Sequence, residues 1–218
     1  DLISDFDLVM VQRVLDMLEE QAIQKHNPLV SVNISGRSLS SNLFMDALLS
    51  LMLESPKVRT QIIFEVTESA KIDDMTVANN FLQDLRSKGN ICCLDDFGVA
   101  ESSFDYLRSL QVDHIKIDGS YVSESLATAR GRHLLRAMVG MCKNLGIATI
   151  GEMVEDEKTA NILWESGVQF GQGYLFGKPD TDVETLKTFG KVCSHYHGVV
   201  KVKKLEPKKK RQWWERKD

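Results

Sequence analysis

The sequence predicts an α/β domain in which a parallel sheet curves into a barrel. Two observations lead to this prediction. Segments with helical and strand-like periodicity alternate along most of the chain, and the strand-like segments have one apolar face and one face that becomes polar toward the C-terminal end. A barrel explains the polar face, because its interior opens into a mouth at the C-terminal ends of the strands. An open sheet covered on both sides would have more uniformly apolar strands.

The helices are predicted from apolar residues that recur with a period near 3.6. Several of these segments end in a glycine, which commonly terminates a helix. The predicted helices span residues 6–21, 40–54, 77–89, 131–146 and 157–167.

The strands are predicted from short β-type runs between the helices, read with a period of two. In the second run, Ile63, Glu65 and Thr67 share the face that becomes polar. The predicted strands span residues 29–35, 61–68, 90–97, 113–119, 147–155 and 168–176.

Composition and charge exclude several classes of protein. The chain is 43% hydrophobic and 27% charged, as in an ordinary globular domain, and it has no apolar run long enough to cross a membrane. Its cysteines lack zinc-site spacing, so we expect a reducing, cytoplasmic setting for the domain, with an upstream membrane anchor left open. Residues 199–218 carry nine basic and three acidic residues, which gives this segment a charge of +6. Because the net charge of the whole chain is −4, residues 1–198 carry a charge of −10. An acidic body argues against binding a nucleic-acid polymer.

We therefore expect a barrel domain over residues 1–190 and a basic tail over residues 191–218. A solvated tail is the simplest interpretation. Basic residues followed by Trp213 and Trp214 also suit an anionic membrane surface or a protein partner.

Polar residues recur where the predicted strands end. Clustered carboxylates repel one another unless cations neutralise them, and hard oxygen ligands suit Mg²⁺, Mn²⁺ or Ca²⁺ rather than Zn²⁺. Adjacent acids also cap helices, and Lys116 could instead pair with Asp118 as a structural ion pair. The strand-end residues are Asn33, Glu65, Asp95, Asp96, Lys116, Glu152 and Gln172.

Six motifs over residues 1–180 resemble, in order and spacing, the EAL domain of bacterial cyclic-di-GMP phosphodiesterases. The resemblance implies a modified TIM barrel with one antiparallel strand, and hydrolysis of cyclic-di-GMP to linear pGpG with two Mg²⁺ or Mn²⁺ ions. Ca²⁺ is a candidate inhibitor. The motifs are VSVNISGRSL (30–39), FEVTES (64–69), LDDFGVAESSFDYL (94–107), VDHIKIDGSYV (112–122), GEMVEDEKTANILWESG (151–167) and GQGYLFGKP (171–179).

The resemblance also assigns roles to single residues. It implies that the metal ligands are Asn33, Glu65, Asp95 and Asp96, with Asp95 shared between the two ions. It implies a catalytic group of Lys116, Glu152 and Gln172, in which Glu152 is the general base or a ligand through water. It places Glu68, Asp118 and Pro179 at substrate-contacting or loop-supporting positions, although Glu68 alone would suit a helix cap.

The chain departs from the family pattern in three places. The signature Glu-Ala-Leu strand lies upstream of the residues given, so we expect the first strands and one metal ligand to be absent from this chain. Ala100 and Glu101 stand where the family has glycine and an aromatic residue, and Met153 stands where it has glycine. Replacing glycine is costly where the backbone φ is positive.

Two functions follow from the resemblance. The first is a metal-dependent phosphodiesterase, which the intact charged positions favour. The second is a catalytically weak EAL domain that acts as a cyclic-di-GMP receptor in motility, polarity or biofilm signalling, which the altered loop favours. The resemblance also implies a homodimer through the barrel face near the loop after Asp96, and a signalling protein as a further partner.

The altered loop gives a first prediction. In a protein that carries the upstream glutamate, replacing Ala100 by Gly and Glu101 by Tyr should raise metal-dependent turnover, because glycine restores backbone freedom and the loss of Glu101 removes a charge near the cations. Geometry matters here, since a displacement of about 1 Å can cost on the order of a hundredfold in rate. Steady-state turnover and dinucleotide affinity are measured together. Unchanged turnover at unchanged metal occupancy would assign the altered loop to an interface instead.

Overall fold

The computed structural model describes residues 2–23, 28–67, 72–99, 103–178 and 199–201. Within them, one sheet has the strand order β1-β2-β3-β4-β5-β6-β7. Strands β1 to β6 are parallel to their neighbours, and β7 is antiparallel to β6. The strands are β1 (Val30–Ile34), β2 (Ile62–Thr67), β3 (Ile91–Phe97), β4 (His114–Ile117), β5 (Ala148–Gly151), β6 (Phe170–Gln172) and β7 (Val199–Lys201).

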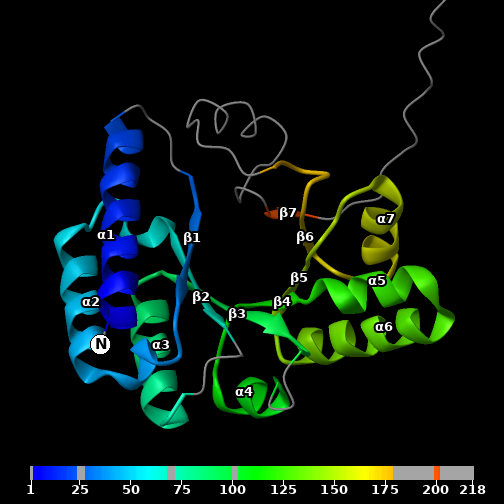
Figure 1. Ribbon diagram of the computed structural model, residues 1–218, viewed down its shortest axis with the longest axis horizontal. Coiled ribbons are helices and arrows are strands. Elements are labelled where there is room, and N and C mark those ends of the chain that lie inside the picture. Colours follow the sequence, from blue (N-terminus) through cyan, green and yellow to red (C-terminus); the bar gives the residue numbers. More distant parts are fainter. Residues whose placement is uncertain (1, 24–27, 68–71, 100–102, 179–198, 202–218) are drawn as a thin grey trace, which may run out of the picture.

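The helices lie along the outside of this curved sheet (Figure 1). Helices α1, α2 and α3 accompany the first strands, and α5, α6 and α7 accompany the last ones. The helices are α1 (Leu2–Ile23), α2 (Asn42–Glu54), α3 (Met75–Ser87), α4 (Ser103–Ser109), α5 (Gly119–Ala127), α6 (Ala129–Asn144) and α7 (Glu157–Glu165), with single 3-10 turns at Ser38–Ser40 and Arg59–Gln61.

The predicted barrel architecture is confirmed as a half-barrel of six parallel strands with helices on one side. All six predicted strands and all five predicted helices are present. The last two strands are shorter than predicted, because β5 ends at Gly151 and β6 at Gln172. Helices α4 and α5 were not predicted, and β7 lies in the segment that the sequence assigns to the tail.

Helix starts follow ordinary capping chemistry. Asp74, Thr128 and Asp156 each accept hydrogen bonds from backbone N–H groups in the first turns of α3, α6 and α7. These bonds satisfy donors that have no partner within the helix.

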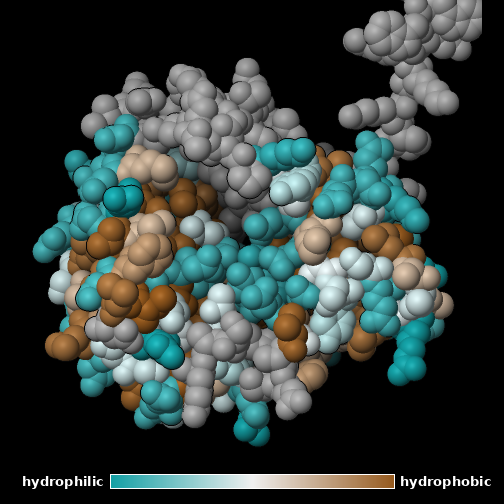
Figure 2. Space-filling model, viewed as in Figure 1, coloured by the Kyte–Doolittle hydropathy of each residue, from teal (hydrophilic) through white to brown (hydrophobic). Residues whose placement is uncertain are grey.

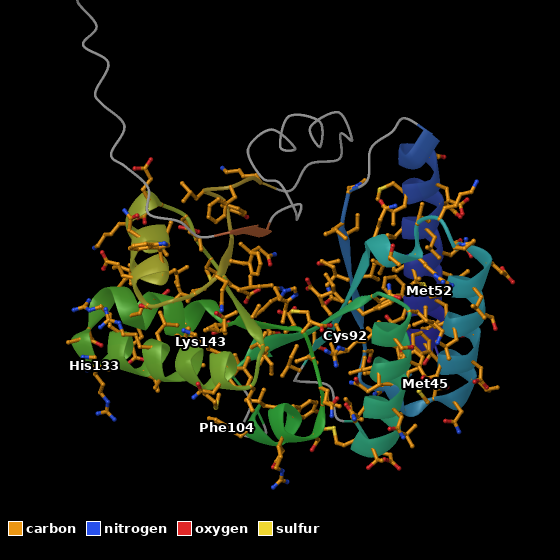
Figure 3. All side chains as sticks on the ribbon, turned by 180° about the vertical axis from the view of Figure 1, so that it is seen from behind. Met45, Met52, Cys92, Phe104, His133 and Lys143 are labelled. Atoms are coloured by element: carbon orange, nitrogen blue, oxygen red, sulfur yellow. The ribbon has the colours of Figure 1, made fainter. Side chains whose placement is uncertain are left out.

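Most apolar side chains pack between the sheet and the helices. Met45 and Met52 of α2 and Cys92 of β3 belong to this layer (Figure 3). A second, smaller cluster of Ile63, Cys93 and Ile150 lies on the opposite face of the sheet. The alternation of side chains along each strand separates the two layers, so Cys92 and Cys93 face opposite sides. The smaller cluster forms an apolar floor on the face that also carries the predicted site residues.

One residue, Asp113, ties four elements together at the N-terminal end of the strands. Asp113 accepts bonds from Arg86 Nε (3.0 Å) and Nη2 (2.7 Å) on α3, and from the backbone N–H of Cys92 (2.9 Å). Its carbonyl accepts a bond from Ala148 N–H at 3.0 Å. Asp113 therefore fixes α3, β3 and β5 relative to the start of β4.

We expect Asp113→Ala to lower the free energy of unfolding by about 2 kcal/mol, because charge-assisted bonds are among the stronger hydrogen bonds in proteins. The matched control is Asp105→Ala, which removes the exposed pair with Arg108 and should change stability by less than about 1 kcal/mol. Urea unfolding at constant m-value measures both. Equal effects for the two variants would contradict the role given to Asp113.

Candidate active site

A buried lysine brings together acids from three neighbouring strands. The Lys116 side chain on β4 is 5% exposed, and its Nζ lies 2.8 Å from Asp95 Oδ1 on β3. The same Nζ lies 2.9 Å from Glu152 Oε1, directly after β5, and 3.2 Å from Glu65 Oε2 on β2. Lys116 pairs with these acids, so the alternative of an ion pair with Asp118 is not what the structure shows.

Strand register explains why these side chains meet. Glu65 lies opposite Cys93, and Cys93 lies opposite His114, so all three share the inner face of the sheet. Asp95 and Lys116 lie two residues further along the same face. Parallel strands bring their C-terminal ends to the same edge, and that edge carries the acids. Hydrophilic side chains gather at the centre of the face shown in Figure 2, where β3 to β5 lie in Figure 1.

Asp96 reaches the site because the strand departs from regular geometry. Strict alternation would turn Asp96 toward the helices. Instead the register between β3 and β4 shifts between Leu94 and Phe97, and Asp96 has a φ of +55°. Its backbone N–H donates to Asp95 Oδ1 at 3.0 Å. Bulges often re-aim side chains at functional sites, and Asp tolerates the left-handed region better than most residues.

The result is a cluster of oxygen ligands. Asp95, Asp96 and Glu152 each present a carboxylate oxygen within 4.8 Å of the others. Carboxylate oxygens are hard ligands that suit divalent cations such as Mg²⁺ and Mn²⁺. The donor set therefore fits a divalent metal ion.

Burial and charge shift the pKa values in this cluster. Burial raises the pKa of Glu152, and its ion pair with Lys116 offsets this only in part. Burial, followed by the nearby charge of Asp95, raises the pKa of Asp96. Burial works to lower the pKa of Lys116, but the charges of its three carboxylate partners outweigh it and the pKa is raised. Lys116 therefore stays protonated, while two acids hold protons more readily than they would in water.

The remaining predicted residues have different positions. Asn33 lies opposite Glu65 in the register of β1 and β2 and is exposed. Gln172 ends β6, and its buried Oε1 has no hydrogen-bond partner among the described residues. Asp118 caps α5 by accepting a bond from Ser120 N–H at 2.9 Å. Glu68 and Pro179 lie outside the described residues.

A cavity adjoins the acids and adds residues that the sequence analysis did not single out as site residues. Its volume is about 280 Å³, and Glu152 and Gln172 line it on the side of the acids. Glu155 and Tyr174 were missed, although both stand in the motifs that supply Glu152 and Gln172. Met153 was noted only as a departure from the family. The full lining is Glu152, Met153, Glu155, Gln172, Gly173 and Tyr174.

The half-barrel and its acid-lined strand ends are those of an EAL domain. The model of the EAL domain family matches residues 1–179, and the chain belongs to this family. The predicted resemblance is thereby confirmed.

Three similar proteins place the chain within the family. The cyclic di-GMP phosphodiesterase PdeB of Shewanella oneidensis is 32% identical over 162 residues, which is 74% of this chain and 19% of that protein. The EAL domain of Mycobacterium smegmatis DcpA is 27% identical with a TM-score of 0.75, covering 83% of this chain and 82% of that one. The manganese/cy-diGMP complex of Klebsiella pneumoniae BlrP1 is 28% identical with a TM-score of 0.66, and the match covers 81% of this chain and 45% of that one.

The chain thus spans about a fifth of the length of PdeB. Among the described residues, we find no helix whose length and apolar character would let it span a membrane.

Lys116→Met should destabilise the fold at neutral pH by about 3 kcal/mol or more, because it leaves Glu65, Asp95 and Glu152 buried without their cation. The loss should shrink as the pH falls from about 7.5 to 5. Without Lys116 the pKa of Glu152 rises further above its unfolded value, and a group with a raised folded pKa favours folding only while it stays protonated.

Unfolding free energies of wild type and variant are compared at both pH values. Lys143→Met is the control, because Lys143 is exposed on α6 (Figure 3) and should cost little at either pH. A loss for Lys116→Met that grows toward pH 5 would contradict this account.

Proposed function

We propose that this EAL domain hydrolyses cyclic-di-GMP to pGpG at the strand ends around Lys116. The observation that carries the proposal is the buried Lys116, which contacts acids of three neighbouring strands beside Asp96. The names of PdeB and of the BlrP1 complex support the same substrate.

Lys116 contributes positive charge where a phosphodiester would accumulate negative charge. Its Nζ is buried and protonated, so its charge is little screened by water. Fixed charge aimed at the developing oxyanion is a large source of rate enhancement in enzymes. Three acids hold Lys116 in place, so little reorganisation is needed when substrate binds.

Asp95 and Asp96, with Glu65 and Asn33 beside them, would hold the divalent ions, and Glu152 lies next to them in the same oxygen cluster. The bound ions, Mg²⁺ or Mn²⁺, supply Lewis acidity toward the phosphodiester. Asp95 is central to this assignment, because it belongs to the oxygen cluster and also pairs with Lys116 at 2.8 Å.

Glu152 would accept a proton from the attacking water, and Gln172 would help to orient that water. Burial raises the pKa of Glu152, which brings it closer to the range in which a carboxylate accepts a proton at neutral pH. The Gln172 Oε1 atom is a hydrogen-bond acceptor without a partner among the described residues, and both side chains line the same cavity. A water in that cavity would be able to donate to Glu152, beside the side chain of Gln172.

A receptor function is the second candidate. It is favoured by Met153, which has a φ of +53° at the position where the family has glycine, directly after Glu152. A non-glycine residue in this region is strained. Such a domain would bind cyclic-di-GMP and pass the signal to a protein partner with little turnover.

We expect Asp95→Asn to lower manganese-dependent turnover by at least about a hundredfold, because it removes one cluster carboxylate and weakens the hold on Lys116. It should also remove the rise in melting temperature that Mn²⁺ produces, since an ion that binds only the folded state stabilises it by mass action. The control, Asp105→Asn, changes an exposed acid on α4 and should leave both measurements unchanged.

The assay follows the formation of pGpG from cyclic-di-GMP with and without Mn²⁺. Tight binding of the dinucleotide without turnover by the wild type would favour the receptor function. Failure to bind the dinucleotide at millimolar concentration, with and without metal, would contradict both functions.

A further inference from the structure

The first turn of α5 contacts the two loops that carry the outer acids of the site. This turn, Asp118–Tyr121, begins two residues after Lys116, and we call it the α5 turn. One loop follows Asp96 at the end of β3, and the other holds Glu152 after β5. Asp118 fixes the α5 turn from within by accepting bonds from the backbone N–H and the hydroxyl of Ser120.

Tyr121 holds the loop after Asp96. Its hydroxyl donates to the carbonyl of Gly98 at 2.8 Å. Its ring lies so close to Gly98 that a Cβ atom there would be 2.5 Å from Tyr121 Cε2, and Gly98 has a φ of +103°. The backbone N–H of Val99 then donates to the Asp96 carbonyl at 3.2 Å. Tyr121 therefore fixes Gly98, and the tight turn from Asp96 to Val99 fixes Asp96 relative to Gly98.

Met153 holds the loop after Glu152. Its side chain fills the space above Gly119, where an added Cβ atom would lie 2.5 Å from Met153 Cγ. The backbone on either side is also fixed, because Glu152 N–H donates to the Ile117 carbonyl at 3.2 Å and Val154 N–H donates to the Gln172 carbonyl at 3.0 Å. Met153 adopts its left-handed φ of +53° while packed against Gly119.

We propose that the α5 turn sets the separation between Asp96 and Glu152, and that Tyr121 and Met153 are positioning residues acting through these two acids. Two observations support it independently: the hydrogen bond from Tyr121 to Gly98, and the packing of Met153 on Gly119. Both contacts start from the α5 turn, which the backbone connects directly to Lys116. The inference rests on the proposed function, because Asp96 and Glu152 matter only if they serve the site.

Tyr121→Phe tests the first contact with little change in shape. It keeps the ring beside Gly98 and removes only the hydroxyl. We expect kcat to fall about threefold to tenfold, the scale of one lost hydrogen bond, with the KM for cyclic-di-GMP unchanged. The Mn²⁺ concentration for half-maximal activity should rise by a similar factor.

The matched control is Ser125→Ala in the same helix. Ser125 is buried and its hydroxyl donates to the Val122 carbonyl at 2.7 Å, so this variant also loses one hydroxyl-to-carbonyl bond. It should lower the melting temperature about as much as Tyr121→Phe does, while kcat and the Mn²⁺ requirement stay at wild-type values. If both variants changed kcat in proportion to the melting temperature, Tyr121 would be merely structural and the inference would be wrong.

Met153→Gly tests the second contact. Glycine relieves the left-handed backbone, so the melting temperature should stay near that of wild type although kcat falls and the Mn²⁺ requirement rises. The control is Leu145→Gly at the end of α6, which removes a side chain of comparable exposure, 57% against 61%, at the opposite end of β5 from Glu152. A kcat equal to or above wild type for Met153→Gly would show that Met153 does not position Glu152.

A manganese titration without dinucleotide separates failure of this inference from failure of the proposed function. If wild type is stabilised by Mn²⁺ but hydrolyses nothing, the phosphodiesterase function fails. The inference then stands if Tyr121→Phe and Met153→Gly need more Mn²⁺ for the same stabilisation, and falls if they do not. If Mn²⁺ does not stabilise wild type and no hydrolysis occurs, both fall together.

Discussion

The site depends on one buried cation that holds three carboxylates at the mouth of a curved sheet. Glu65, Asp95 and Glu152 approach Lys116 to within 3.2 Å, although each of these charges would keep more of its hydration in open solvent. A buried ion pair repays its desolvation only when its geometry is good and several partners share the charge. Here the sheet supplies that geometry, because neighbouring strands in register place the four side chains at one edge. The apolar floor below them excludes water on one side and strengthens each interaction.

Backbone strain is concentrated beside the same acids. Among the described residues, only Asp96 and Met153 are non-glycine residues with positive φ. Asp96 is itself a member of the oxygen cluster, and Met153 follows Glu152 directly. Such conformations persist only where the surrounding structure enforces them, and they are typical of functional sites. The hydrogen bond from Tyr121 to Gly98 and the packing of Met153 on Gly119 are the contacts that could enforce them here.

Much of this arrangement was predictable from the sequence, and the exceptions have physical reasons. A period of two placed Glu65 and Lys116 on the polar faces of their strands, the end of the next predicted strand indicated Asp95, and the structure brings the three together. The same period would have turned Asp96 away, because alternation cannot anticipate a bulge. Helices α4 and α5 span only seven and nine residues, which gives little periodicity to recognise, and the equally short α7 was predicted because Gly167 marks its end. The contact between Met153 and Gly119 joins residues about thirty positions apart in sequence, and no local sequence pattern predicts such a contact.

The charge balance of the cluster supports the proposed binding of cations and a phosphodiester. Glu65, Asp95, Asp96 and Glu152 with Lys116 carry a net charge of −3 when all are ionised. Burial is the main cause of the raised pKa values of Asp96 and Glu152, and the neighbouring carboxylates add to it, so that holding a proton relieves part of this excess. Two divalent ions would relieve it further and leave a surplus of one positive charge, which a single phosphodiester group neutralises. Removing one carboxylate would therefore disturb both the hold on Lys116 and the charge that the site would offer to the proposed substrate.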